Sequence, residues 1–135
     1  MTYANWALGM GRAAAVDLML DTVTITRPTG APGAIDPETG ERGPAPTTTV
    51  YTGPGKVQTY EPYETTQRSG EHMYVQQRYY LQLPITATMV AVGDTATVTA
   101  SANDPALTGR TYRVAGEHAK SWATARRVLI DEVVA

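Results

Sequence analysis

The residues whose types could support chemistry are a glycine-rich stretch, two histidines and a serine in a polar segment. A match to the G-x-G-x-x-A pattern of dinucleotide-binding proteins covers residues 9–14. That pattern binds phosphate after a strand, at the N-terminus of the helix of a βαβ unit. No strand-like segment precedes Gly9 and no parallel unit follows, so the small residues indicate instead a helix that packs closely on a neighbour.

The histidines and the serine do not form a recognisable reactive set. His72 and His118 are far apart in sequence, and a metal site would need both to converge with carboxylates such as Asp94. Ser69 lies near His72, but the chain has no G-x-S-x-G turn that would hold a nucleophile rigidly. We therefore expect no enzymatic activity, no metal and no cofactor.

Basic and aromatic residues gather near the C-terminal end of the sequence. The pair Arg126 and Arg127 is close in sequence to Tyr112 and Trp122, a combination that single-strand-binding barrels use. The formal net charge of −2 opposes tight binding of nucleic acid. Ion pairing at a subunit or partner interface is the alternative interpretation of these residues.

A second aromatic and basic group alternates along one predicted strand, where Tyr74, Arg78 and Tyr80 share a face. Tyr and Arg are enriched where proteins contact proteins, although an ordinary amphipathic strand has the same pattern. The candidate subunit or partner interface comprises Tyr74, Arg78, Tyr80, Arg113, Trp122, Arg126 and Arg127.

The elements that must position these residues are mostly strands. The 135 residues suffice for a single domain, residues 1–135, and contain 42% hydrophobic and 18% charged residues, which allows a buried core. There is no cysteine, so no disulfide can form. No segment reaches the roughly 20 apolar residues that cross a bilayer, so we expect a chain without membrane contact.

The chain is expected to begin with one helix, residues 1–20, which is rich in Ala, Leu and Met. Alternating apolar and polar residues then predict short strands, separated by two long loops at 28–47 and 61–72. The predicted strands are 22–26, 48–60, 73–83, 95–100, 111–115 and 121–133. The fold class expected is mainly β: a small antiparallel β-barrel of the SH3-like kind, with a sandwich as the alternative.

The order and the residue composition of these segments resemble those of a known family. DTVTITRP at 21–28 is followed by DPETG at 36–40, VYTGPGKVQ at 50–58, YYLQLP at 79–84 and YRVAG at 112–116, and HAKSWATARR at 118–127 comes last. This succession resembles the head-to-tail stopper (head-completion, connector) proteins of long-tailed phages, particularly those that infect actinobacteria. The resemblance spans nearly all of the chain and includes no catalytic signature.

The resemblance implies a structural virion protein located at the neck, between head and tail, and present in the host cytoplasm during assembly. Its expected partners are further copies of itself in a ring of six or twelve, the portal or adaptor protein, and the tail terminator. Double-stranded DNA would pass through the ring without sequence-specific binding.

In related stoppers, a long loop between early barrel strands closes the channel. By position it corresponds here to 61–72, with 28–46 as the rival segment. The candidate channel loop residues are Glu61, Tyr63, Glu64, Gln67, Arg68, Glu71 and His72. The glutamates of this segment would repel phosphate, which suits a plug that must not bind DNA tightly.

Other classes stay open on the sequence. A tail terminator or minor tail protein would also form rings, and more helix is expected in a terminator. A single-stranded nucleic-acid-binding barrel would show salt-dependent binding to DNA. A small enzyme would need a convergent pocket, which the sequence does not reveal.

Overall fold

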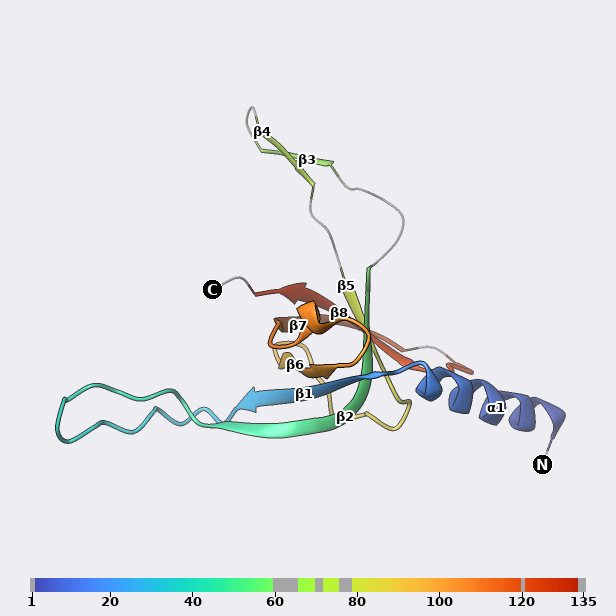
Figure 1. Cartoon of the computed structure of the whole chain (residues 1–135), viewed down its shortest axis with the longest axis horizontal. Helices are drawn as coiled ribbons and strands as arrows, with labels where there is room; N and C mark the ends of the chain where they lie inside the picture. The colour runs from blue at the N-terminus through green and yellow to red at the C-terminus, as the bar shows by residue number, and fades with distance from the viewer. Residues whose placement is uncertain (1, 60–65, 70–71, 76–78, 120, 134–135) are drawn as a thin grey trace.

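The structure, a computed structural model, describes residues 2–59, 66–69, 72–75, 79–119 and 121–133. It is mainly β, with six antiparallel strands closed into a barrel and a single N-terminal helix, which confirms the predicted fold class (Figure 1). The elements are α1 (Tyr3–Asp17), β1 (Asp21–Pro28), β2 (Thr47–Thr59), β3 (Thr66–Ser69), β4 (His72–Val75), β5 (Tyr79–Leu83), β6 (Thr95–Ser101), the 3-10 helix η1 (Pro105–Leu107), β7 (Thr111–His118) and β8 (Arg126–Glu132).

The barrel strands follow the order β1-β2-β5-β8-β7-β6, and β6 closes the barrel by pairing with β1. All of these pairings are antiparallel. Strands β3 and β4 pair with each other in a separate two-stranded sheet. In the sequence they lie between β2 and β5. Closure gives each barrel strand a neighbour on both sides, which satisfies backbone groups that an open sheet would expose.

The core follows from the alternation of side chains along each strand. On β1, Val23 and Ile25 are fully buried, and the threonines between and beside them point the other way. The other barrel strands contribute in the same manner, so the interior is a continuous apolar cluster. Its largest fully buried apolar side chains are Val23, Ile25, Leu81, Leu83, Val98, Tyr112, Val114, Val128 and Ile130.

The long strand β2 serves two walls of the barrel. Its first part pairs with β1 as far as Gly55, and its last four residues pair with β5. Figure 1 shows the strand curving between these two partners. A Cβ atom on Gly55 would lie 2.8 Å from Val23 Cγ2. A glycine at this position therefore lets β1 and β2 approach closely where β2 bends from one wall of the barrel to the other.

Helix α1 is shorter than the predicted 1–20 and projects away from the barrel (Figure 1), and it contacts the turn that precedes β8. Thr2 caps it by accepting a hydrogen bond from the Asn5 amide, 3.2 Å, and the helix ends before Leu18. The close packing predicted for the small residues is confirmed at Gly11, where a Cβ would lie 3.0 Å from Thr124. It is wrong for Gly9, which has nothing within 4 Å.

The prediction of a loop over residues 61–72 is wrong in part, because four of these residues form a strand. Thr66–Ser69 forms β3 and pairs in register with β4, from Thr66 opposite Val75 to Ser69 opposite His72. Two residues separate these strands in sequence, which is the spacing of a tight hairpin. The polar composition concealed the strand, since a hairpin outside the core has no need of an apolar face. The other predicted loop, 28–47, is largely irregular, as expected.

Two predicted strands also have different bounds. The segment 73–83 contributes to two strands, because β4 pairs with β3 whereas β5 pairs with β2 and β8. The predicted strand 121–133 begins at Arg126. Trp122 has a φ of 60°, a left-handed conformation that cannot continue an extended strand. Among the described residues, no helix combines the length and apolar character that crossing a lipid bilayer requires.

Candidate interaction surfaces

The residues predicted for the channel loop lie at or beyond the edge of what the structure describes. Gln67 and Arg68 belong to β3, and His72 begins β4, opposite Ser69. The other four, Glu61, Tyr63, Glu64 and Glu71, lie outside the described residues. The channel-loop assignment therefore stays a prediction, now attached to a hairpin rather than to an irregular loop.

The structure brings together two residues of the predicted interface, Tyr80 and Arg127. The Arg127 guanidinium lies over the Tyr80 ring, 5.6 Å from its centroid, in a cation–π contact between β5 and β8. On the other side of β5, the Tyr80 hydroxyl donates to Gln58 Oε1, and Gln82 Nε2 donates to the same oxygen at 3.0 Å. Gln58, Tyr80, Gln82 and Arg127 thus form a polar and aromatic strip across β2, β5 and β8.

Three of the remaining interface candidates have described side chains. Arg113 is exposed on β7, opposite Asp131 of β8, and Trp122 is exposed in the turn that lies beside α1. Arg126 is partly buried, with one guanidinium nitrogen 3.5 Å from the Ile85 carbonyl oxygen. The side chain of Tyr74 and the whole of Arg78 lie outside the described residues. The grouping of all seven residues into one interface therefore stays a prediction.

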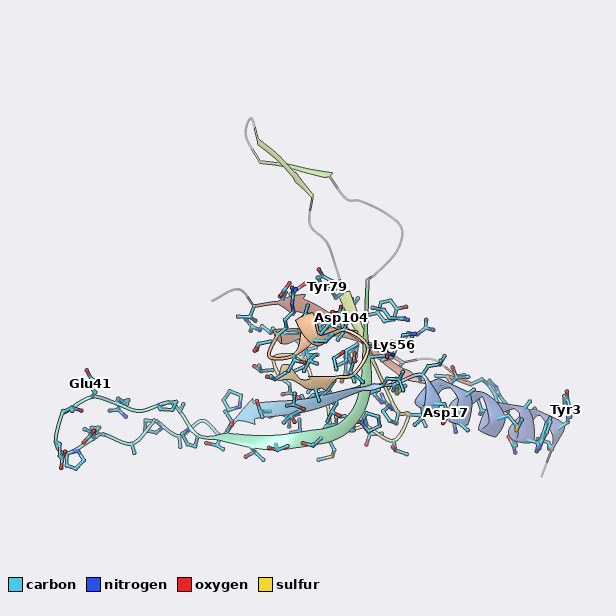
Figure 2. The ribbon with its side chains drawn as sticks, in the orientation of Figure 1. Tyr3, Asp17, Glu41, Lys56, Tyr79 and Asp104 are labelled. Carbon is cyan, nitrogen blue, oxygen red and sulfur yellow. The ribbon has the colours of Figure 1, made fainter. Side chains whose placement is uncertain are left out.

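A second surface is the arm, residues 29–46, which extends the β1–β2 ribbon away from the barrel (Figures 1 and 2). Its two sides are joined by backbone hydrogen bonds from Thr29 to Pro46 and from Gly43 to Ala34, 3.1 and 2.7 Å. At the tip, the Asp36 side chain accepts from the Glu38 amide at 2.8 Å, which fixes the turn. A concavity of about 340 Å³ near the tip is lined by Ala34, Ile35, Asp36, Thr39, Glu41, Arg42 and Gly43.

The middle of the arm depends on two glycines. A Cβ on Gly33 would lie 1.9 Å from the Gly43 carbonyl oxygen, a distance that no side chain tolerates. Arg42 crosses the ribbon at this point and donates to the Gly33 carbonyl oxygen at 3.1 Å. The arm is thus an ordered hairpin with its own internal contacts, although it lies outside the hydrophobic core.

Replacing Gly33 with valine is expected to open the arm without destabilising the barrel. The new side chain must displace the Gly43 backbone, and overpacking of this kind costs about 1–3 kcal/mol. Trypsin should then cut after Arg42 about tenfold faster or more, while the melting temperature of the barrel stays unchanged. Ala34→Val, at an exposed neighbouring position, is the control; equal cleavage of both variants would contradict the role assigned to Gly33.

At the base of the arm, Arg27 of β1 is held by the buried residue Asp94. Arg27 Nε and one terminal nitrogen donate to the two carboxylate oxygens at 2.8 and 3.0 Å, and the same terminal nitrogen donates to the Met89 carbonyl at 2.8 Å. The Ala91 amide also donates to Asp94 at 2.9 Å. Burial raises the pKa of Asp94, but the hydrogen bonds and charge of Arg27 and the Ala91 amide outweigh it, and the pKa is lowered.

Sequence reasoning missed this ion pair entirely, because the partners are 67 positions apart. The ion pair also changes how Asp94 is understood, since this carboxylate, considered above for a metal site, is occupied by a guanidinium. Residues 9–14 lie inside α1 rather than at its N-terminus, so the dinucleotide interpretation is excluded on geometry. The part of the chain that the structure describes contains no group of three potential metal ligands.

Comparison with known proteins places the chain in a family. No curated protein matches it. The family model described as "Family of unknown function (DUF6093)" matches residues 11–131, from the middle of α1 to the end of β8, which is most of the chain. The barrel, its arm and the β3–β4 hairpin therefore all fall within the matched region, and the chain belongs to the DUF6093 family.

Proposed function

We propose that this chain is a structural protein of a phage particle, a head-to-tail stopper whose copies form a ring at the neck. The observation that carries the proposal is a small closed barrel bearing three extensions: α1, the arm and the β3–β4 hairpin (Figure 1). Each extension leaves the barrel in a different direction. The resemblance of segment order described above supports the same assignment.

Extensions of this kind need contacts beyond their own strands to be stable. A two-stranded ribbon is marginally stable alone in water, and the arm and the β3–β4 hairpin are both ribbons of this kind. Features of this kind are maintained where neighbouring subunits cover them, as in a ring in which each copy contacts two others. A ring subunit therefore gives a role to surfaces that a monomeric barrel would leave without one.

The charge of the arm is consistent with contact with a passing duplex. Asp36, Glu38 and Glu41 lie near its tip, with Arg42 as the single cation between residues 29 and 46. Carboxylates repel the phosphate backbone, so a segment of this composition can obstruct DNA without binding it. The arm and the β3–β4 hairpin are the two candidates for the segment that closes the channel.

The test shortens each candidate segment in the phage that encodes the chain. Thr66 pairs with Val75 and Ile35 bridges to Arg42, so either hairpin can be closed there by an Asn-Gly turn with its register preserved. We expect the variant lacking residues 67–74 to give particles that attach tails but lose packaged DNA. The variant lacking residues 36–41 serves as its matched control and should retain DNA.

The measurements are electron microscopy of purified particles and the amount of nuclease-protected DNA per particle. Density for the chain in a collar at the neck is the expected location. Absence of the chain from particles, or its location on the outer shell, would overturn the proposed function. Normal DNA retention by the 67–74 variant, with loss by the 36–41 variant, would assign the channel segment to the arm.

A further inference from the structure

Helix α1 has an apolar face that the rest of the described chain leaves uncovered. Tyr3, Trp6 and Met10 are 81%, 51% and 58% exposed, and they recur at i, i+3 and i+7, which places them on one side of the helix. The rings of Tyr3 and Trp6 lie 5.8 Å apart, so these side chains form a continuous surface. We call this surface the α1 stripe.

The opposite side of α1 is the one that contacts the barrel. Arg12 Nε donates to the Ala123 carbonyl oxygen at 3.1 Å, and Gly11 lies against Thr124. Leu8, Gly11, Arg12 and Ala15 are the partly buried residues of the helix. The stripe therefore points away from its own barrel, and Figure 2 shows Tyr3 at the end of α1 that lies far from it.

Side-chain size along the outward face is asymmetric. Tyr3, Trp6 and Met10 occupy the first part, whereas the later outward positions, Ala13 and Ala14, are small and exposed. Two such helices packed antiparallel would place the large residues of one against the small residues of the other. With Met10 at the centre, Trp6 of each copy faces Ala14 of the other, which is the large-to-small alternation of a well-packed helix pair.

The charges near the two ends of α1 also favour an antiparallel arrangement of two helices. Asp17 lies at the C-terminal end of α1, where the helix dipole is unfavourable to an anion, and the last turn carries no basic residue. The first turn carries no acidic residue. In an antiparallel pair, Asp17 of each copy lies beside the first turn of the other, whose free amides favour a carboxylate. Position 17 then also faces position 3, within reach of the Tyr3 hydroxyl.

We propose that α1 docks antiparallel on α1 of a second copy of this chain, about a two-fold axis at Met10. The stripe is a patch of a few hundred Å², smaller than the about 800 Å² per partner of a standard stable interface, so the pair is reversible. A membrane surface is the less favourable occupant, because the outward face has no Lys or Arg, and Arg12 faces the barrel. This inference does not rest on the proposed function.

Sedimentation of the full chain over a range of concentrations tests the pairing. The unmodified chain should show a monomer–dimer equilibrium, and Met10→Glu, which sets two carboxylates against each other at the axis, should raise the dissociation constant tenfold or more. The matched control is Met89→Glu, because Met89 is 65% exposed but lies outside α1; it should leave the equilibrium unchanged. Melting curves establish that both variants fold.

Single cysteines test the geometry, since the chain has none of its own. Met10→Cys should form a disulfide-linked dimer, and Tyr3→Cys should link to Asp17→Cys when the two variants are mixed. A chain that stays monomeric, a Tyr3→Cys variant that links efficiently to itself, or association unaffected by Met10→Glu would overturn the proposal. Binding of the chain to anionic vesicles through α1, in place of self-association, would also overturn it. None of these results depends on whether rings form at a phage neck.

Discussion

Asp94→Ala is expected to lower the free energy of unfolding by about 3 kcal/mol. The carboxylate is 1% exposed and accepts hydrogen bonds from Arg27 and from the Ala91 amide. The substitution removes these charge-assisted bonds and leaves the Arg27 guanidinium and the partly buried Ala91 amide without this acceptor. Urea unfolding at neutral pH measures the loss. Asp131→Ala, at an exposed carboxylate, is the control and should change stability by less than about 0.5 kcal/mol.

The same pair has a defined pH dependence. Because the pKa of Asp94 is lowered in the folded chain, its contribution is fully present above the ordinary Asp pKa of about 3.9 and is lost as pH falls through the lowered value. The stability difference between the unmodified chain and Asp94→Ala should therefore stay constant from pH 7 to about pH 4 and narrow below it. A difference that narrows near neutral pH, or one that persists unchanged to pH 2, would contradict the assigned ion pair.

Leu81→Ala is expected to have an effect of similar or larger size, about 3–4 kcal/mol. Leu81 is 1% exposed on β5, the strand that joins the wall of β2 to the wall of β8. Truncation leaves a cavity at the centre of the apolar cluster, where the flanking strands are fixed by their ladders and cannot close the space. Leu20→Ala removes the same atoms at a position that is 55% exposed.

Thermal and urea unfolding of these two leucine variants separate the effect of burial on stability from the effect of removing the same atoms at an exposed position. Leu20→Ala should change stability by less than about 0.5 kcal/mol. If the two variants lost equal stability, the barrel interior would not be the main source of folding energy. If Leu81→Ala lowered the slope of the urea transition as well as its midpoint, the variant would either unfold in more than one step or expose less surface on unfolding.

The barrel could be predicted from sequence because its strands face a core on one side only. Val23 and Ile25 alternate with threonines, and this period requires no knowledge of the partner strand. The hairpin of β3 and β4 could not be predicted in the same way. Most of β4 falls within the predicted strand 73–83, but its partner β3 is polar throughout and shows no apolar alternation.

The candidate surfaces were predictable only in part, for a related reason. Tyr80 and Arg127 were both singled out as interface residues, but their contact depends on β5 lying beside β8, and strand order is not visible in a pattern of alternation. Arg27 and Asp94 meet for the same topological reason. For α1, the broadly apolar sequence predicted a helix but did not distinguish the covered side from the side that carries Trp6.

Strand β2 connects the arm, at its first residue, to the segment that leads to the β3–β4 hairpin, at its last. Its 13 residues run without interruption from Thr47, where the arm ends, to Thr59, where the chain departs toward β3. Along its curved path a strand of that length covers about 40 Å, and the ladders with β1 and β5 hold it on either side of the bend. The end of the arm and the end of the strand that leads to β3 are therefore parts of one hydrogen-bonded strand, and the bend near Gly55 fixes the angle between them.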